Sequence, residues 1–174
     1  MPFLHEELSQ RNLPVLFDAW PAGDFSAAWE KRKKELLQIL EENVYGKTPP
    51  PPSYVGSELL EHQESALAGN TVMEKRELSF MTPKGIFSFP FYLLIPNGMK
   101  KPPVLLYLSF HRDIWSPYLP LEEITDQGFA VAFFCYQDAV PDTCDGQYDQ
   151  GLAEKFLHGG PRYSGEWGKI GMWA

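Results

Sequence analysis

The chain has 174 residues, of which 44% are hydrophobic and 14% aromatic, and this is enough apolar material for one folded domain with a buried core. Its formal net charge of −8 provides no basic surface for nucleic acid or anionic lipid, so we expect neither partner. Two cysteines are too few for a disulfide framework and are wrongly spaced for a zinc site, so we expect no metal and no cofactor.

Residues 1–23 are predicted to form an irregular N-terminal segment, because Pro14, Pro21 and Gly23 interrupt it. The segment has acidic residues near its start, Glu6 and Glu7, and has no apolar core of the length that a signal peptide needs. No later stretch is both apolar and long enough to span a bilayer. We therefore expect a cytoplasmic protein that does not enter a membrane.

A helix is predicted over residues 24–46, with Asp24 or Ser26 as its N-cap and Gly46 placed to end it. Charged side chains occupy one side of this helix, and we expect the opposite, apolar side to pack on a core. The apolar residues at helical spacing are Trp29, Leu36, Leu37, Leu40 and Val44.

Residues 47–71 are predicted to form a connector, because they contain four successive prolines, Pro49–Pro52. Such a run can neither continue a helix nor pair in the middle of a sheet. We interpret it as a stiff spacer. The alternative, a docking motif for a domain that binds proline-rich segments, lacks the support of a second proline repeat.

The core of the sheet is predicted within residues 72–136. Strand-like alternation over 72–81 and 86–95, with a tight turn between them, predicts an antiparallel hairpin. Pro90 indicates that the second of these strands lies at an edge or contains a bulge.

A βαβ unit is predicted after the hairpin. Residues 104–108 and 129–136 are continuous apolar runs, as is typical of strands buried on both faces, and a short helix is predicted between them over 118–128. Strands connected in this way are parallel with a right-handed crossover, so the whole sheet should be mixed.

Residues 137–166 are predicted to form a long loop that leaves the carboxyl end of the second buried strand. Such loops often build the walls of an active site. The final residues, 167–174, are predicted to begin a helix.

Several stretches resemble one family of bacterial α/β-hydrolases, related to acetyl xylan esterases and glucuronoyl esterases. They are Tyr118–Ile124 (YLPLEEI), Gly128–Asp138 (GFAVAFFCYQD), Glu166–Ala174 (EWGKIGMWA), the early helix with Trp29, and Val44–Gly46 (VYG). The resemblance covers nearly the whole chain. It implies that residues 1–174 are a single, truncated domain, the N-terminal portion of an α/β-hydrolase fold with an incomplete sheet. It also implies a serine hydrolase that acts on carboxylic esters of carbohydrates or other small molecules.

No catalytic residue is assigned, because the sequence contains no Gly-x-Ser-x-Gly elbow and the resemblance places the nucleophile beyond Ala174. We therefore expect the chain alone to be inactive. The strand that ends at Leu108 would lack its next neighbour, and its bare apolar edge predicts a homodimer or a second, complementing chain. The alternative function is a non-catalytic module that dimerises or binds a partner through this edge.

The resemblance assigns part of the substrate site to the loop after strand 104–108. Phe110 or His111 would donate a backbone N–H to an oxyanion, and Arg112 would hold the carboxylate of an acidic sugar. The alternative is that His111 and Arg112 order this loop against Asp113 and the acidic segment 137–166.

Three further site residues, Tyr136, Gln137 and Asp138, leave strand 129–136 at its carboxyl end. Ligands collect at such strand ends in open α/β sheets. The alternative is that these three side chains only shape the loop that follows.

Other nucleophile and cation sets are less favoured. Ser109, His111 and Asp113 alternate within one short loop and cannot easily bond in series, and nothing fixes the approach of Cys144 to His158. A solvated acidic loop is favoured over a calcium site, because the aspartate spacing is wrong for an EF-hand and the closing glutamate is missing. The aspartates concerned are Asp138, Asp142, Asp145 and Asp149.

Overall fold

The computed structural model describes residue 10 and residues 23–115, 117–143 and 145–174. The chain separates into two compact units, Met1–Leu40 and Glu41–Ala174. Nearly all of the predicted irregular segment 1–23 lies outside the described residues. Within the described ranges, no helix is long and apolar enough to cross a membrane.

The helix of the first unit, α2, spans Phe25–Leu40. Asp24 is its N-cap, because its Oδ1 accepts the backbone N–H groups of Ser26 at 2.9 Å and Ala27 at 3.3 Å. Helical structure continues without a break into a π-helical turn, η1 (Glu41–Tyr45), at the start of the second unit, and Gly46 follows it, so the predicted end of the helix is confirmed. Leu36 and Leu40 on the apolar side of α2 are half-buried and no residue of α2 is fully buried, and the packing of this side on a core stays a prediction.

The π-helical turn η1 is held by a segment more than a hundred residues later in the chain. The N–H of Gly165 donates to the carbonyl of Glu42 at 2.9 Å, and the N–H of Gly168 donates to that of Tyr45 at 2.7 Å. The last carbonyls of a helix lack partners within it, and these bonds satisfy them. Two of the stretches that carry the family resemblance, Val44–Gly46 and Glu166–Ala174, are thus brought together.

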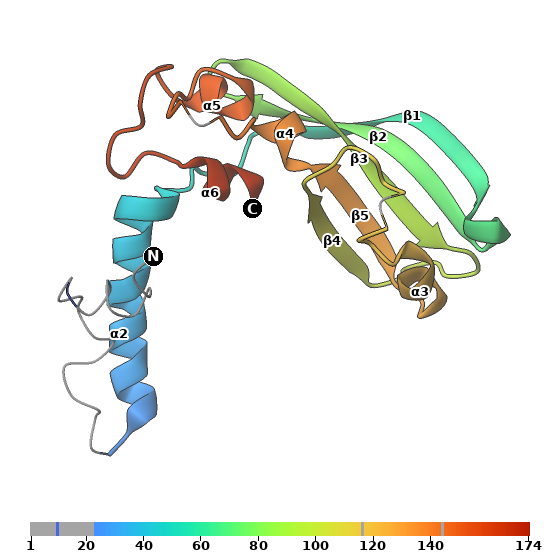
Figure 1. Cartoon of the computed structure of the whole chain (residues 1–174), viewed down its shortest axis with the longest axis horizontal. Helices are drawn as coiled ribbons and strands as arrows, with labels where there is room; N and C mark the ends of the chain where they lie inside the picture. The colour runs from blue at the N-terminus through green and yellow to red at the C-terminus, as the bar shows by residue number, and fades with distance from the viewer. Residues whose placement is uncertain (1–9, 11–22, 116, 144) are drawn as a thin grey trace. The chain divides into compact units, whose positions relative to one another are not determined.

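The second unit is built on a mixed five-stranded sheet with the order β1-β2-β3-β5-β4 (Figure 1). Neighbouring strands are antiparallel except for β4 and β5, which are parallel. This confirms the predicted mixed sheet. The strands are β1 (Val55–Ala66), β2 (Thr71–Thr82), β3 (Gly85–Pro96), β4 (Val104–Ser109) and β5 (Ala130–Cys135).

Strand β1 occupies much of the predicted connector 47–71, which corrects that prediction. β1 pairs with β2 from Val55 opposite Phe80 to Ala66 opposite Thr71, with two irregularities in the register. Because β1 is an edge strand, almost all of its residues are exposed, and its glutamates hide the alternation that marks a strand in a sequence.

The hairpin of β2 and β3 is confirmed, with Thr82 opposite Gly85 at its turn. The prediction for Pro90 needs correction, since β3 lies inside the sheet order rather than at an edge. Only Tyr92, Leu93 and Leu94 of β3 pair with β5, however, so Pro90 stands where β3 has a single partner strand. A missing N–H is tolerated at such a place.

The predicted βαβ unit is confirmed as β4, helix α3 (Leu121–Asp126) and β5. The predicted burial holds for β5, where four of six residues are buried, but it is wrong for β4. Leu106 is 69% exposed and Val104 is 57% exposed. Among the described strands β4 lies at the end of the sheet and pairs only with β5, so its other edge is uncovered.

Two apolar clusters hold this unit together. One packs the loop before α3, and α3 itself, on one face of the sheet through Ile114, Leu119, Leu121, Leu94, Val131 and Phe133. The other gathers residues that follow β5: Val140, Leu152, Ala153, Leu157 and Met172. The predicted loop 137–166 therefore contains ordered elements, α4 (Tyr136–Ala139) and α5 (Gly151–Phe156). The predicted helix start at 167–174 is confirmed as α6 (Lys169–Trp173).

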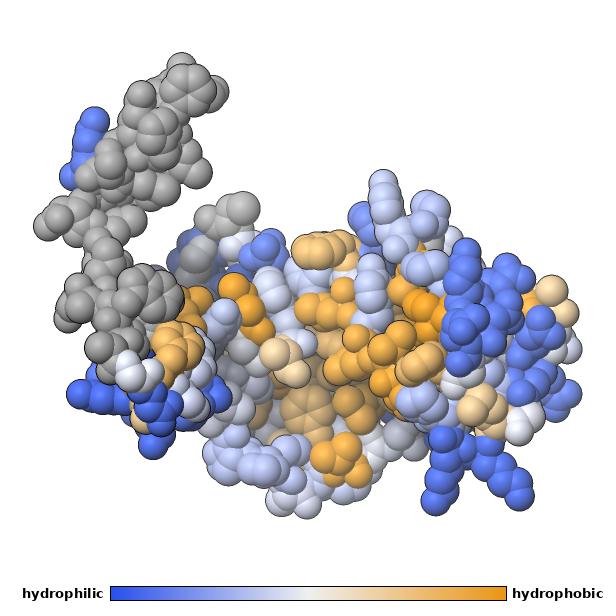
Figure 2. All heavy atoms as spheres, turned by 90° about the horizontal axis from the view of Figure 1, so that it is seen from below, coloured by the Kyte–Doolittle hydropathy of each residue, from blue (hydrophilic) through white to orange (hydrophobic). Residues whose placement is uncertain are grey.

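Apolar side chains also gather on a surface of this unit (Figure 2). An apolar cavity of about 410 Å³ lies there, bounded by Leu106 of β4, Phe134 of β5, Phe89 of β3 and Trp173 of α6. Leu106, the β4 residue in its lining, is 69% exposed. Within the described residues, one edge of β4 has no partner strand, and most of the apolar side chains of β4 are exposed.

Lys84, in the turn between β2 and β3, ties that turn to α5. Its Nζ donates to the carbonyl of Glu154 at 2.9 Å and to that of Leu157 at 2.6 Å. A cation that satisfies carbonyls at the end of a helix stabilises that end. We expect Lys84→Met to lower the free energy of unfolding by about 1–2 kcal/mol in urea denaturation. An unchanged midpoint would contradict this role, and Lys100→Met at an exposed turn is the control.

Candidate functional site

The candidate site lies at the carboxyl ends of β4 and β5. These strands are parallel, and their last residues, Ser109 and Cys135, are partners in the register. The loop that begins at Phe110 and the helix α4 that begins at Tyr136 therefore leave the sheet at the same edge. This is the position where ligands bind in open α/β sheets.

A row of three aromatic rings crosses the site. Phe110, which is 75% exposed, packs edge-on against Tyr136 with ring centres 5.5 Å apart. Tyr136 in turn packs edge-on against Trp173, with ring centres 4.9 Å apart. Gln137 Nε2 donates to the hydroxyl of Tyr136 at 3.3 Å. The row joins two of the predicted site residues to a third residue that the sequence did not place at the site.

An ion pair links the two walls of the site. Arg112 Nε donates to Asp138 Oδ1 at 2.6 Å. This hydrogen bond raises the pKa of Arg112 above its ordinary value. The Arg112 side chain is 65% exposed, whereas that of Asp138 is 16% exposed, so the guanidinium keeps further N–H donors toward solvent. The ion pair is the contact expected if Arg112 orders its loop against the acidic segment 137–166. The exposed N–H groups of Arg112 can still bind a carboxylate.

The loop after β4 is arranged by its own backbone. His111 donates its backbone N–H to Ser109 Oγ at 3.0 Å, and Asp113 Oδ1 accepts the N–H of Trp115 at 2.9 Å. Ser109 and Asp113 are thus each used in a local turn, which agrees with the rejection of a Ser109-His111-Asp113 triad. The bond to Ser109 Oγ occupies the backbone N–H of His111, which is one of the two predicted oxyanion donors.

The structure also describes most of the residues of the two other less favoured sites, the Cys144–His158 pair and the acidic calcium loop. Cys144 lies outside the described residues, while His158 Nδ1 lies 3.6 Å from Glu166 Oε1 and its ring stacks on Tyr163. Asp145 Oδ1 accepts the N–H of Gln147 at 2.9 Å, and this bond lowers the pKa of Asp145. In the parts of the chain that the structure describes, no group of three His, Cys, Asp or Glu side chains is placed to hold a metal ion.

A small cavity beside the ion pair adds residues that the sequence did not indicate. It has a volume of about 240 Å³ and is lined by Lys75 and Tyr92 in addition to Arg112 and Asp138. Lys75 is paired with Glu61 at 2.9 Å. No sequence signal connects Lys75 to this site, because it lies on β2, and only the pairing of the strands brings it near β5.

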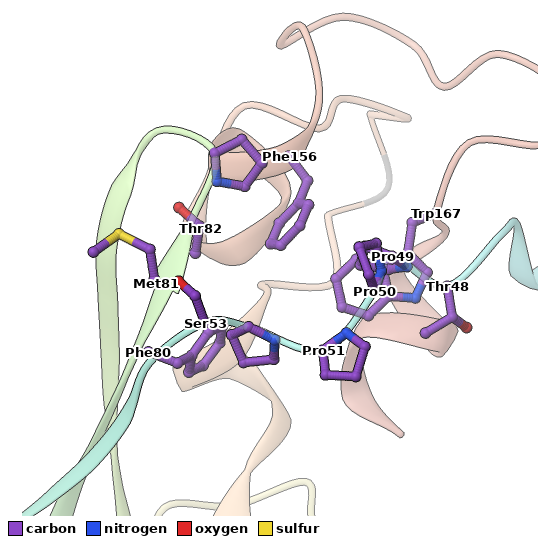
Figure 3. Close-up of a pocket in the computed structure, with 12 residues that line it drawn as sticks. Thr48, Pro49, Pro50, Pro51, Ser53, Phe80, Met81, Thr82, Phe156 and Trp167 are labelled. Atoms are coloured by element: carbon purple, nitrogen blue, oxygen red, sulfur yellow. The ribbon is translucent and has the colours of Figure 1, made fainter.

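A larger apolar cavity of about 530 Å³ lies where the proline run passes the end of the β2–β3 hairpin (Figure 3). Pro49–Pro52 line it together with Phe80, Phe156 and Trp167. The prolines thus border aromatic side chains of their own unit, which favours the spacer interpretation of the proline run over a docking motif.

An antiparallel hairpin followed by a βαβ unit, with polar and aromatic residues at the carboxyl ends of the parallel strands, is the arrangement predicted for the N-terminal portion of an α/β-hydrolase fold. The chain matches about half of the length of several solved structures of esterases that share this fold.

The first of these structures is a glucuronoyl esterase from Solibacter usitatus, at 24% sequence identity and a TM-score of 0.67, with 94% of this chain and 52% of that chain covered. The second is a CE15 glucuronoyl esterase from Teredinibacter turnerae, at 20% identity and a TM-score of 0.66, with 95% of this chain and 44% of that chain covered. The third is a promiscuous CE15 esterase from a marine bacterial metagenome, at 20% identity and a TM-score of 0.60, with 85% and 46% covered.

The chain therefore spans about half the length of the solved structures that it matches. At these identities the likeness establishes the fold, and the predicted resemblance to hydrolases of the esterase type is confirmed at that level. No family model matches the sequence, and no curated protein matches it either.

Proposed function

We propose that this chain is the first part of a carboxylic ester hydrolase domain, in which it supplies half of the sheet and one wall of the active site. The observation that carries the proposal is the meeting of Phe110, Arg112, Tyr136 and Asp138 at the carboxyl ends of two parallel strands. It is supported by the esterase names of the solved structures that share the fold.

The serine nucleophile in this proposal stands on a strand that pairs with the free edge of β4. Its sharp turn to a helix would then lie beside the loop that begins at Phe110. One N–H of this loop, from Phe110 or from His111, would stabilise the oxyanion that forms when the serine attacks the ester carbonyl. If His111 is the donor, its N–H must leave Ser109 Oγ, to which it is bonded here at 3.0 Å.

The substrate class that we propose is an ester of a carbohydrate or a related small molecule. Arg112 supports this choice, because a largely exposed guanidinium at the site can bind a sugar carboxylate through two N–H groups. The exposed ring of Phe110 offers an apolar surface beside it. We propose that the rest of the domain comes either from the same polypeptide or from a complementing chain. We also propose that the protein acts in the cytoplasm.

A second candidate function is a non-catalytic module that forms a homodimer or binds a partner through β4. The observation that favours it is the absence of charge on β4, whose sequence is VLLYLS and whose outer side chains are exposed. Edges of this kind pair readily with other chains. Partner binding without any esterase activity in the intact gene product would favour this function over the first.

The first experiment is made on the 174-residue chain alone. We expect no turnover of an activated aryl ester and no covalent labelling by a serine-directed fluorophosphonate, because no nucleophile elbow is present in this sequence. A matched sample of Ser109→Ala tests the serine nearest the site. Specific labelling of the unmodified chain, lost in Ser109→Ala, would contradict the proposal.

A further inference from the structure

Helix α4 carries three of the predicted site residues and is too short to be stable on its own. It consists of only four residues, Tyr136–Ala139, and at its end the N–H of Val140 donates to the carbonyl of Tyr136 at 2.9 Å. A first helical turn fixes several backbone torsions for a single bond, so its formation is unfavourable without outside contacts. Something beyond α4 must therefore hold Tyr136, Gln137 and Asp138 in place.

Trp173 contacts both ends of this turn. Its ring packs edge-on against Tyr136, the first residue of α4, with ring centres 4.9 Å apart. Its Nε1 donates to the carbonyl of Val140, the residue that ends α4, at 3.0 Å. Val140 is almost fully buried, so an unpaired carbonyl there would be costly. One side chain thus satisfies the end of α4 and supports its beginning.

The position of Trp173 is set in turn by the start of α6. The N–H of Met172 donates to the carbonyl of Gly168 at 3.0 Å, and the N–H of Gly168 donates to that of Tyr45 in η1 at 2.7 Å. Gly171 lies so close to Tyr45 that a Cβ on it would be 2.9 Å from the Tyr45 carbonyl. The helix that carries Trp173 is therefore fastened to η1 through backbone contacts.

We propose that Trp173 is the positioning residue for the α4 wall of the candidate site, an inference that rests on the proposed function. Through Tyr136 it supports the exposed ring of Phe110, and through α4 it fixes Asp138, which holds Arg112. In this proposal Trp173 acts through these residues, which it holds in place. Loss of its contacts should loosen α4 while the sheet stays folded.

The test measures hydrogen exchange of the Val140 amide in the full chain, in the unmodified protein and in Trp173→Phe. This substitution keeps a ring beside Tyr136 and removes the Nε1–H donor. We expect the Val140 amide to exchange about tenfold faster, with unchanged exchange of the paired amides of β2 and β3. A fluorotyrosine at position 136 should show a shifted ¹⁹F resonance in the same variant.

Trp167→Phe is the matched control. The Trp167 ring packs edge-on against Phe156, and among the described residues its buried Nε1 has no hydrogen-bond partner, so the same change of side chain should leave Val140 exchange unaltered. Unchanged Val140 exchange in Trp173→Phe, or an equal increase in both variants, would overturn the proposal. The measurement uses no substrate. A completed protein without esterase activity would therefore refute the proposed function and leave this result standing.

Discussion

Replacement of Gly46 by alanine is expected to lower the free energy of unfolding by about 3 kcal/mol, the sum of backbone strain and overpacking. Gly46 has a φ of +74°, which disfavours any residue with a Cβ. A Cβ at this position would also overlap the backbone carbonyl of Glu166. Because the obstacle is backbone, no side-chain rotation can relieve it, and η1 must separate from the segment before α6.

Gly98→Ala is the control for this prediction. Gly98 has a similar φ of +79°, yet nothing lies within 4 Å of a Cβ placed on it. It should therefore lose only the strain contribution, about 1 kcal/mol. Urea denaturation of the two variants separates strain from overlap. Equal losses in both variants would show that the contact between Gly46 and Glu166 contributes nothing to stability.

Replacement of Leu106 by lysine is expected to convert a self-associating chain to a monomer. Leu106 is 69% exposed on a strand that has one partner and no charged residue. Natural edge strands are usually protected by charges, and lysine is the most effective of these. We expect light scattering of the unmodified chain to show dimers or larger species, and that of Leu106→Lys to show a monomer.

Leu60→Lys is the matched control, because Leu60 is 47% exposed on β1, the edge strand at the other end of the sheet. That strand already carries glutamates, so an added lysine should not change the state of association. A clean monomer in the unmodified chain, or equal dissociation by both substitutions, would refute a specific role for β4. In a completed domain Leu106→Lys should instead impair folding, since the next strand would cover it.

The strands with strong alternation or continuous apolar runs could be predicted from the sequence, and β1 could not. The hairpin of β2 and β3 and the βαβ unit stand where the pattern placed them. β1 was hidden because an exposed edge strand needs no apolar face, so its glutamates look like part of a connector. The composition of β4 is that of a central strand, and its place at the edge followed from the family resemblance and not from its own pattern.

The candidate site could be predicted in part for a similar reason. The carboxyl ends of parallel strands converge, so Arg112 and Asp138 could be expected at one place before their ion pair was known. Trp173 and Lys75 could not be expected there, since their position depends on packing between segments far apart in the chain. The local bond from His111 to Ser109 is equally invisible to sequence spacing.

Labelling of the natural gene product with a fluorophosphonate is the most direct test of the proposed function. An antibody raised against this chain would capture the product and anything bound to it, and mass spectrometry would locate the modified residue. We predict one modified serine, on a strand-to-helix elbow in polypeptide outside these 174 residues, attached in the same chain or bound to it. A captured product with no reactive serine, or with the label on a serine of this chain, would contradict the proposed function.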